Sequence, residues 1–209
     1  MVKPWTLSVA SIRCLFGVDE RPQRNPYAIV AAIHLPGGAP ITEVMAYGPW
    51  PITYAGSCSI TFPIPIEAPD VIGQVPSLVW RRPYSVPSPT IQAMDHPDNV
   101  IVLVVILERN DGKPLLLQQL VNNVLVAGLA STVGLHRAAR VEALIQGMNK
   151  AISIPADAAT FDSPLVSTSE LRLTPNDLLR VQAGIVQKDV LFVAENGLYA
   201  VQFELGAAA

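Results

Sequence analysis

An uninterrupted apolar run extends from Val100 to Leu107 and is followed by a polar segment, residues 108–112. Valine and isoleucine make up most of the run, and such β-branched residues favour strands. The run is far shorter than the roughly 20 residues that a membrane-spanning helix needs. A short, continuous apolar run is typical of a strand that is covered on both faces. The pattern therefore predicts a central, fully buried strand over residues 100–107.

Other apolar or alternating segments before this run predict further strands. They cover residues 6–16, 26–35, 42–47, 57–64 and 75–81. In the first of these, simple alternation places Leu7 and Val9 on one face and Ile12 on the other. The last three lie in a stretch crowded with proline, residues 39–90. Because proline is excluded from central strands, we expect these three to be short or at sheet edges.

After the central strand, apolar residues recur at intervals of three and four, which is the helical period. This spacing predicts a helical hairpin over about residues 114–153. Each predicted helix has one apolar side and few charges, so we expect both to pack on the sheets.

The end of the chain returns to strand patterns, over residues 163–173, 189–194 and 198–205. Asn196-Gly197, between the last two, predicts a tight hairpin turn. Thr174 and Asp177 have the spacing of a capping box, which predicts a short helix that ends near Gln182. Together the patterns predict a mainly β protein. We expect an antiparallel β-sandwich in a single domain, residues 1–209, with the helical hairpin inserted at about 114–153.

Composition narrows the class of protein. Half of the residues are hydrophobic, 15% are charged, and the net charge is −3. So few charges leave much of the surface neutral, which favours self-association or a protein partner. The chain has no basic stripe, so a nucleic-acid partner is not expected. No apolar stretch reaches the length of a transmembrane helix. The N-terminal residues carry no apolar leader pattern, so a cytoplasmic location is expected.

The two cysteines, Cys14 and Cys58, are too few for a disulfide framework. We expect two reduced thiols, and a single bridge between neighbouring strands is the alternative.

Three segments of the chain are similar to C2-type β-sandwich domains. They are Leu7-x-Val9-x-x-Ile12 followed by a loop with Asp19 and by Asn25-Pro26-Tyr27, then the strand that ends in Glu108-Arg109-Asn110-Asp111, and then Phe161-Asp162-Ser163-Pro164-Leu165. The resemblance implies a C2-like fold in which loops from these segments meet. Asn25 stands where calcium-binding members carry aspartate, and Glu108 and Asn110 replace their paired aspartates. The resemblance therefore implies a sandwich that has lost strong calcium binding.

Under this resemblance, the candidate metal ligands are oxygen-bearing side chains in the three loops. They are Asp19, Asn25, Glu108, Asn110, Asp111 and Asp162. Calcium binds six to eight oxygens and usually several carboxylates, so calcium is the possible cofactor. The alternative is that these are solvated loop residues, with Asn110-Asp111-Gly112 forming an ordinary turn.

A second polar cluster, Asp95, His96 and Asp98, precedes the central strand. It has the residue types for metal binding or for acid–base chemistry, and it also fits a simple turn. The chain has no phosphate-binding loop, dinucleotide fingerprint or nucleophile elbow, so no catalytic residue is assigned. The sequence favours a non-enzymatic binding or assembly module. The alternatives are a metal-dependent hydrolase that uses this cluster or the loop carboxylates, and a calcium-dependent, peripheral lipid-binding domain.

Overall fold

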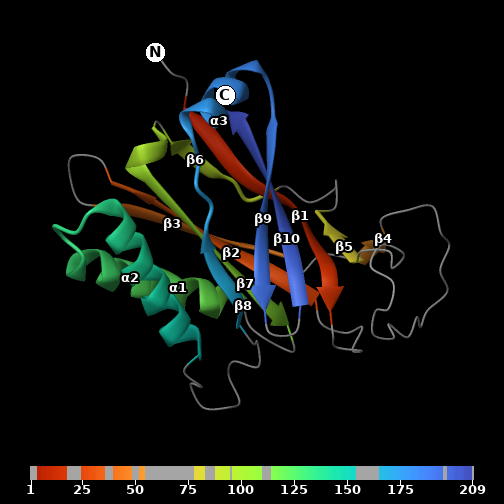
Figure 1. Cartoon of the computed structure of the whole chain (residues 1–209), viewed down its shortest axis with the longest axis horizontal. Coiled ribbons are helices and arrows are strands. Elements are labelled where there is room, and N and C mark those ends of the chain that lie inside the picture. Colours follow the sequence, from red (N-terminus) through yellow and green to blue (C-terminus); the bar gives the residue numbers. More distant parts are fainter. Residues whose placement is uncertain are drawn as a thin grey trace.

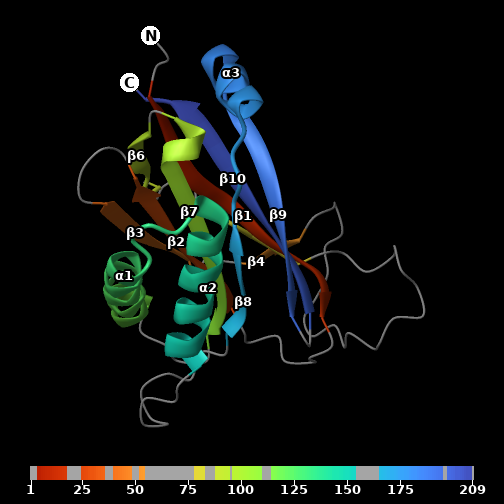
Figure 2. The same ribbon diagram turned by 60° about the vertical axis from the view of Figure 1, so that its left-hand side comes forward.

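The computed structural model contains two antiparallel sheets and three helices within the residues that it describes (Figure 1). Those residues are 4–17, 25–35, 40–48, 52–54, 78–82, 88–94, 96–109, 114–153, 165–194 and 197–208. The sheets are stacked face to face, and two helices form a third layer beside one of them (Figure 2). The protein is therefore mainly β, as the sequence predicts.

The first sheet has six strands in the described part of the chain. They are β1 (Trp5–Gly17), β4 (Ile52–Tyr54), β5 (Leu78–Arg81), β6 (Ile91–Met94), β9 (Val186–Ala194) and β10 (Gly197–Ala207). The order is β4-β5-β1-β10-β9, and β6 pairs with the N-terminal part of β1. Strand β9 pairs only with β10 among these strands, so it forms one edge of the sheet.

The second sheet has four strands in the order β3-β2-β7-β8. They are β2 (Asn25–His34), β3 (Ile41–Tyr47), β7 (Val100–Arg109) and β8 (Leu165–Glu170). Strand β7 is the predicted central strand, and it pairs with β2 along its whole length. A 3-10 turn, η1 (Pro97–Asn99), leads into it.

The β7 run is covered on both faces, as predicted, because residues 100–107 are at most 3% exposed. The even-numbered residues, such as Val102 and Val104, join a core between the two sheets. The odd-numbered residues, such as Leu103 and Val105, join a second core under the helices. One strand therefore contributes to both cores.

The helical hairpin lies where the sequence predicts it. Helices α1 (Pro114–Ser131) and α2 (Arg137–Ser153) connect β7 to its neighbour β8 and cover the outer face of that sheet (Figure 2). The two helices cross instead of lying side by side along their length (Figures 1 and 2). A Cβ atom on Gly128 of α1 would lie 2.7 Å from Leu144 Cδ2 of α2, so glycine permits this close approach. The predicted apolar stripe of α2 is buried, including Leu144 and Met148.

The simple alternation expected for the first strand is wrong at Ile12. Leu7, Val9 and Ile12 all lie in the core between the sheets. The register against β10 shifts between Val9 and Ser11, where β1 carries an extra residue. Such a β-bulge reverses the inside–outside alternation beyond it, so Ile12 joins the buried side.

Most other predicted elements are confirmed with shifted ends. Strand β9 begins at Val186 instead of Asp189, and α3 (Pro175–Ala183) follows Thr174 as expected. The predicted strand 75–81 is described as the shorter β5, and the strand predicted over 57–64 lies outside the described residues. Two short strands, β4 and β6, were not predicted.

Candidate functional site

The predicted metal ligands are only partly within the described residues. Asp19, Asn110, Asp111 and Asp162 lie outside them, and for Asn25 and Glu108 only the backbone is described. Asn25 is opposite Arg109 in the β2–β7 pair, and Pro26 is opposite Glu108. The start of β2 and the end of β7 thus meet at one end of the sheet. The described side chains include no group of three His, Cys, Asp or Glu residues that could hold a metal ion.

The second predicted cluster is described at His96 and Asp98, while Asp95 lies outside the described residues. His96 Nδ1 accepts a 3.3 Å hydrogen bond from the Asp98 backbone N–H and so caps η1. The same nitrogen lies 3.8 Å from Asp98 Oδ2, with the side chains 56% and 75% exposed. This geometry gives the pair a structural role at the entrance to β7. Its use in a hydrolase stays a prediction.

A charged contact that the sequence does not predict joins α2 to the second sheet. Arg137 forms an ion pair with Glu170 of β8, with 2.5 Å between Nη2 and Oε1. Arg137 Nη2 also donates a 2.9 Å hydrogen bond to the Val100 carbonyl. A groove of about 440 Å³ beside this pair is lined by both side chains and by Arg172. Arg137 is already bonded to Glu170 and to the Val100 carbonyl. We therefore assign to Arg137 the role of holding α2 on the sheet.

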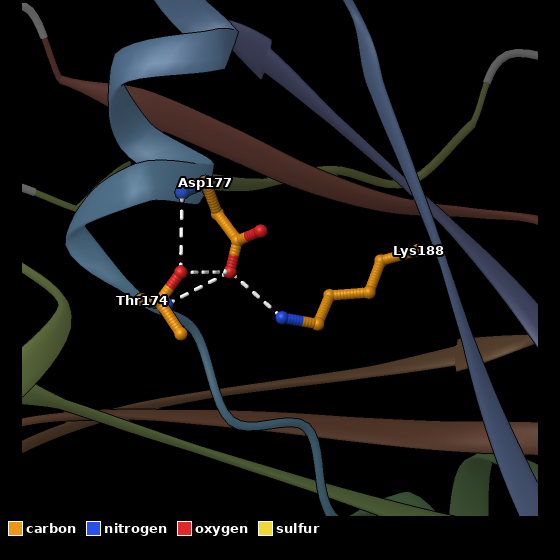
Figure 3. A network of polar contacts seen from close by, with 3 residues as sticks. All are labelled: Thr174, Asp177 and Lys188. Atoms are coloured by element: carbon orange, nitrogen blue, oxygen red, sulfur yellow. Dashed lines mark hydrogen bonds and ion pairs between the residues drawn. The ribbon is translucent and has the colours of Figure 1, made fainter.

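A polar network centred on Asp177 holds α3 against β9 (Figure 3). Asp177 Oδ2 accepts from Thr174 N at 2.8 Å and from Thr174 Oγ1 at 2.9 Å. The Asp177 N–H donates to Thr174 Oγ1 at 3.2 Å, which completes the predicted capping box. Lys188 Nζ lies 2.7 Å from the same Oδ2. Burial raises the pKa of the Asp177 carboxyl, but the bonds from Lys188 and Thr174 outweigh burial and hold this pKa below its ordinary value.

A row of amide side chains on α1 lies along β3, which is one edge strand of the second sheet. Gln118 Nε2 donates a 2.6 Å hydrogen bond to the Val44 carbonyl, and Thr42 Oγ1 donates to Asn122 Oδ1 at 3.1 Å. Beside them a groove of about 320 Å³ is lined by Val44 and four amide residues, Gln118, Gln119, Asn122 and Asn123. The sequence signal for this groove is a pair of adjacent amides that is repeated after four residues, Gln118-Gln119 and Asn122-Asn123.

The outer side of α1 differs in character from that of α2. Residues 114–135 contain no Asp, Glu, Lys or Arg, whereas α2 exposes Glu142 and Lys150. In and just after the C-terminal half of α1, apolar side chains face water. We call the set Val126, Ala127, Ala130, Val133 and Leu135 the α1 surface. Val126, Val133 and Leu135 are 53%, 78% and 45% exposed.

Comparison with known proteins gives no family for this chain: no family model, no curated protein and no solved structure matches it. Among the helices that the structure describes, none has the length and apolar character to cross a bilayer.

Proposed function

We propose that the chain is a non-enzymatic binding or assembly module that associates with a second copy of itself through the α1 surface. In this proposal the fold is C2-like and has lost strong calcium binding. The antiparallel register of β2 against β7 sets Asn25 opposite Arg109. This register supports a C2-like fold, because such a fold requires the start of β2 to lie beside the end of β7.

The observation that carries the proposal is the contrast between two helices of one layer. Both bury one side on the same sheet, and their other sides face solvent. On α2 the solvent side carries Glu142 and Lys150, as is usual for a helix face in water. On α1 the equivalent side carries exposed Val126 and Ala130, the turn just after the helix exposes Val133, and none of these positions is charged. Contiguous exposed apolar groups with no charge among them are a mark of contact surfaces.

The composition of the α1 surface indicates which partner covers it. Val126 and Ala130 lie one helical turn apart on α1, Val133 follows in the turn after the helix, and all three are small or medium-sized. A second α1 presents the same uncharged stripe, so two copies can cover each other about a two-fold axis. No charged group of α1 would lose its hydration in that contact, which lowers the cost of burial.

Sedimentation velocity across a wide concentration range tests this proposal. The test variant is Val126→Glu with Ala130→Lys, because this pair is favourable within a helix and should leave α1 folded. The control is Ala138→Glu with Glu142→Lys, which places the same pair on the solvent side of α2. The unaltered chain and the control should associate with rising concentration, and the α1 variant should stay monomeric. Equal behaviour of the three proteins would refute the proposal.

A further inference from the structure

We propose that the groove between β3 and α1 binds an extended, uncharged peptide segment, whose backbone is bonded by the side-chain amides of Gln119 and Asn123. The groove lies beside the N-terminal half of α1, before the α1 surface defined above. The inference goes beyond self-association and does not depend on it.

The protein contains a template for this recognition. Gln118 of α1 bonds the backbone of Val44, and one helical turn later Asn122 bonds the side chain of Thr42. Four helical residues rise by about 6 Å. Two strand residues span nearly the same distance, about 6.8 Å. Amides four apart on α1 therefore match alternate residues of an extended segment that runs alongside the helix.

The second pair of amides repeats this spacing. Gln119 and Asn123 are also four residues apart, and both are exposed. Neither makes a hydrogen bond to another residue that the structure describes. Both line the groove together with Val44. Its volume of about 320 Å³ is at the lower end of the range for ligand sites, roughly 300–1,000 Å³.

The chemistry of the lining selects the class of ligand. A primary amide carries both a donor and an acceptor, and so does each backbone peptide unit. Two amides at strand-matched spacing can therefore each bond one peptide unit of a neighbouring extended chain. The described residues that line the groove carry no charged side chain, so an ionic ligand gains no partner among them. Val44 supplies an apolar contact for one side chain of the ligand.

The test is an NMR titration of the full chain that follows the side-chain NH2 signals of Gln119 and Asn123. The probe is a blocked peptide with the sequence of residues 41–47 in which glutamine replaces the glutamate, so that it is neutral and strand-forming. A matched probe carries proline at two alternate positions, which removes backbone donors and disturbs the extended pairing. The protein variants are Gln119→Ala with Asn123→Ala, and Gln182→Ala as a control at an exposed amide on α3.

We expect the first probe to shift the Gln119 and Asn123 signals and the proline probe to leave them in place. The double variant lacks these signals, so its affinity is read from backbone amide signals beside the groove. It should bind at least about tenfold more weakly, because two hydrogen bonds are lost, and the Gln182 control should bind normally. Equal affinity of the double variant, or no shift at millimolar peptide, would overturn the proposal. A neutral oligosaccharide such as maltohexaose that shifts these signals when the peptide does not would also overturn it. Self-association measured on the same double variant should be unchanged, so the two proposals fail separately.

Discussion

Lys188 Nζ lies 2.7 Å from Asp177 Oδ2, and this contact joins an edge strand to the helix that precedes it in the chain. Lys188 is on the inner side of β9, between Val186 and Val190, which pack against the core. An inward-pointing charge on an edge strand discourages pairing with another chain. Asp177 lowers the cost of turning the Lys188 side chain inward, because it supplies the opposite charge. The same carboxylate caps α3, so one residue fixes both elements.

Replacing Asp177 with alanine should destabilise the protein by about 2–4 kcal/mol. The change removes the capping box and leaves the partly buried Lys188 without its partner. Urea unfolding monitored by circular dichroism measures this difference. The control is Asp189→Ala, which removes an ion pair with Arg13 whose side chains are 33% and 43% exposed. Exposed pairs contribute little, so the control should lose less than about 1 kcal/mol. Equal losses in both variants would contradict the role of the Asp177 network.

The stabilisation of the folded protein by Asp177 should also depend on pH, in a defined direction. Its pKa in the folded protein is lowered, so the stabilisation is present above the pKa of the unfolded state, about 4. It is lost as the pH falls through the lower, folded-state pKa. The unfolding free energy of the unaltered chain minus that of Asp177→Asn should therefore be largest near neutral pH and shrink below about pH 4. A difference that is constant from pH 7 to pH 2 would show that charge plays no part.

The two glycines at the helix contact should respond differently to alanine. At Gly147 a Cβ atom would lie 3.7 Å from Val124 Cγ1, an ordinary contact, so Gly147→Ala should stabilise the protein by about 0.5–1 kcal/mol. At Gly128 the new atom would lie 2.7 Å from Cδ2 of the buried Leu144. Overpacking of this kind costs about 1–3 kcal/mol and should cancel the gain in helix propensity. Thermal unfolding should show that Gly147→Ala is more stable than Gly128→Ala. Equal stabilisation by the two changes would contradict the close approach at Gly128.

Calcium should not stabilise the protein strongly. A site with a Kd of about 10 µM would add about 2.7 kcal/mol at 1 mM calcium, because calcium would bind only the folded state. Asn25 and Glu108 stand where calcium-binding C2 domains carry aspartate, so we expect no such gain in stability. Thermal unfolding with and without 1 mM calcium measures this, with magnesium as the control. A calcium-specific rise in Tm that Asp111→Asn abolishes would contradict the proposal and favour a calcium-dependent domain.

Much of the architecture could be predicted from apolar periodicity. The β7 run is buried as expected, the strand predicted over residues 198–205 is confirmed as part of β10, and the capping box places α3. The apolar patterns succeed because the faces that carry them are buried, in one core or in both. The bulge after Val9 could not be predicted, since the extra residue changes register without changing composition. The short strands β4 and β6 give too few residues for any period to show.

The candidate site was less accessible to sequence reasoning. His96 and Asp98 have residue types that suit metal binding or acid–base chemistry, but their described contacts are those of a local cap. The amides of α1 carry no chemical signature of function, and their importance appears only when β3 lies beside them. That proximity joins segments more than 70 residues apart, as in Gln118 and Val44, and local sequence patterns do not encode it.

The most direct test of the central claim is a pair of NMR spectra of the full chain, recorded at low and high protein concentration. Self-association through the α1 surface predicts concentration-dependent shifts at Val126, Ala130 and Val133, with Ala138 and Glu142 of α2 unchanged. Spectra that do not change with concentration, or shifts that fall on another face, would contradict it.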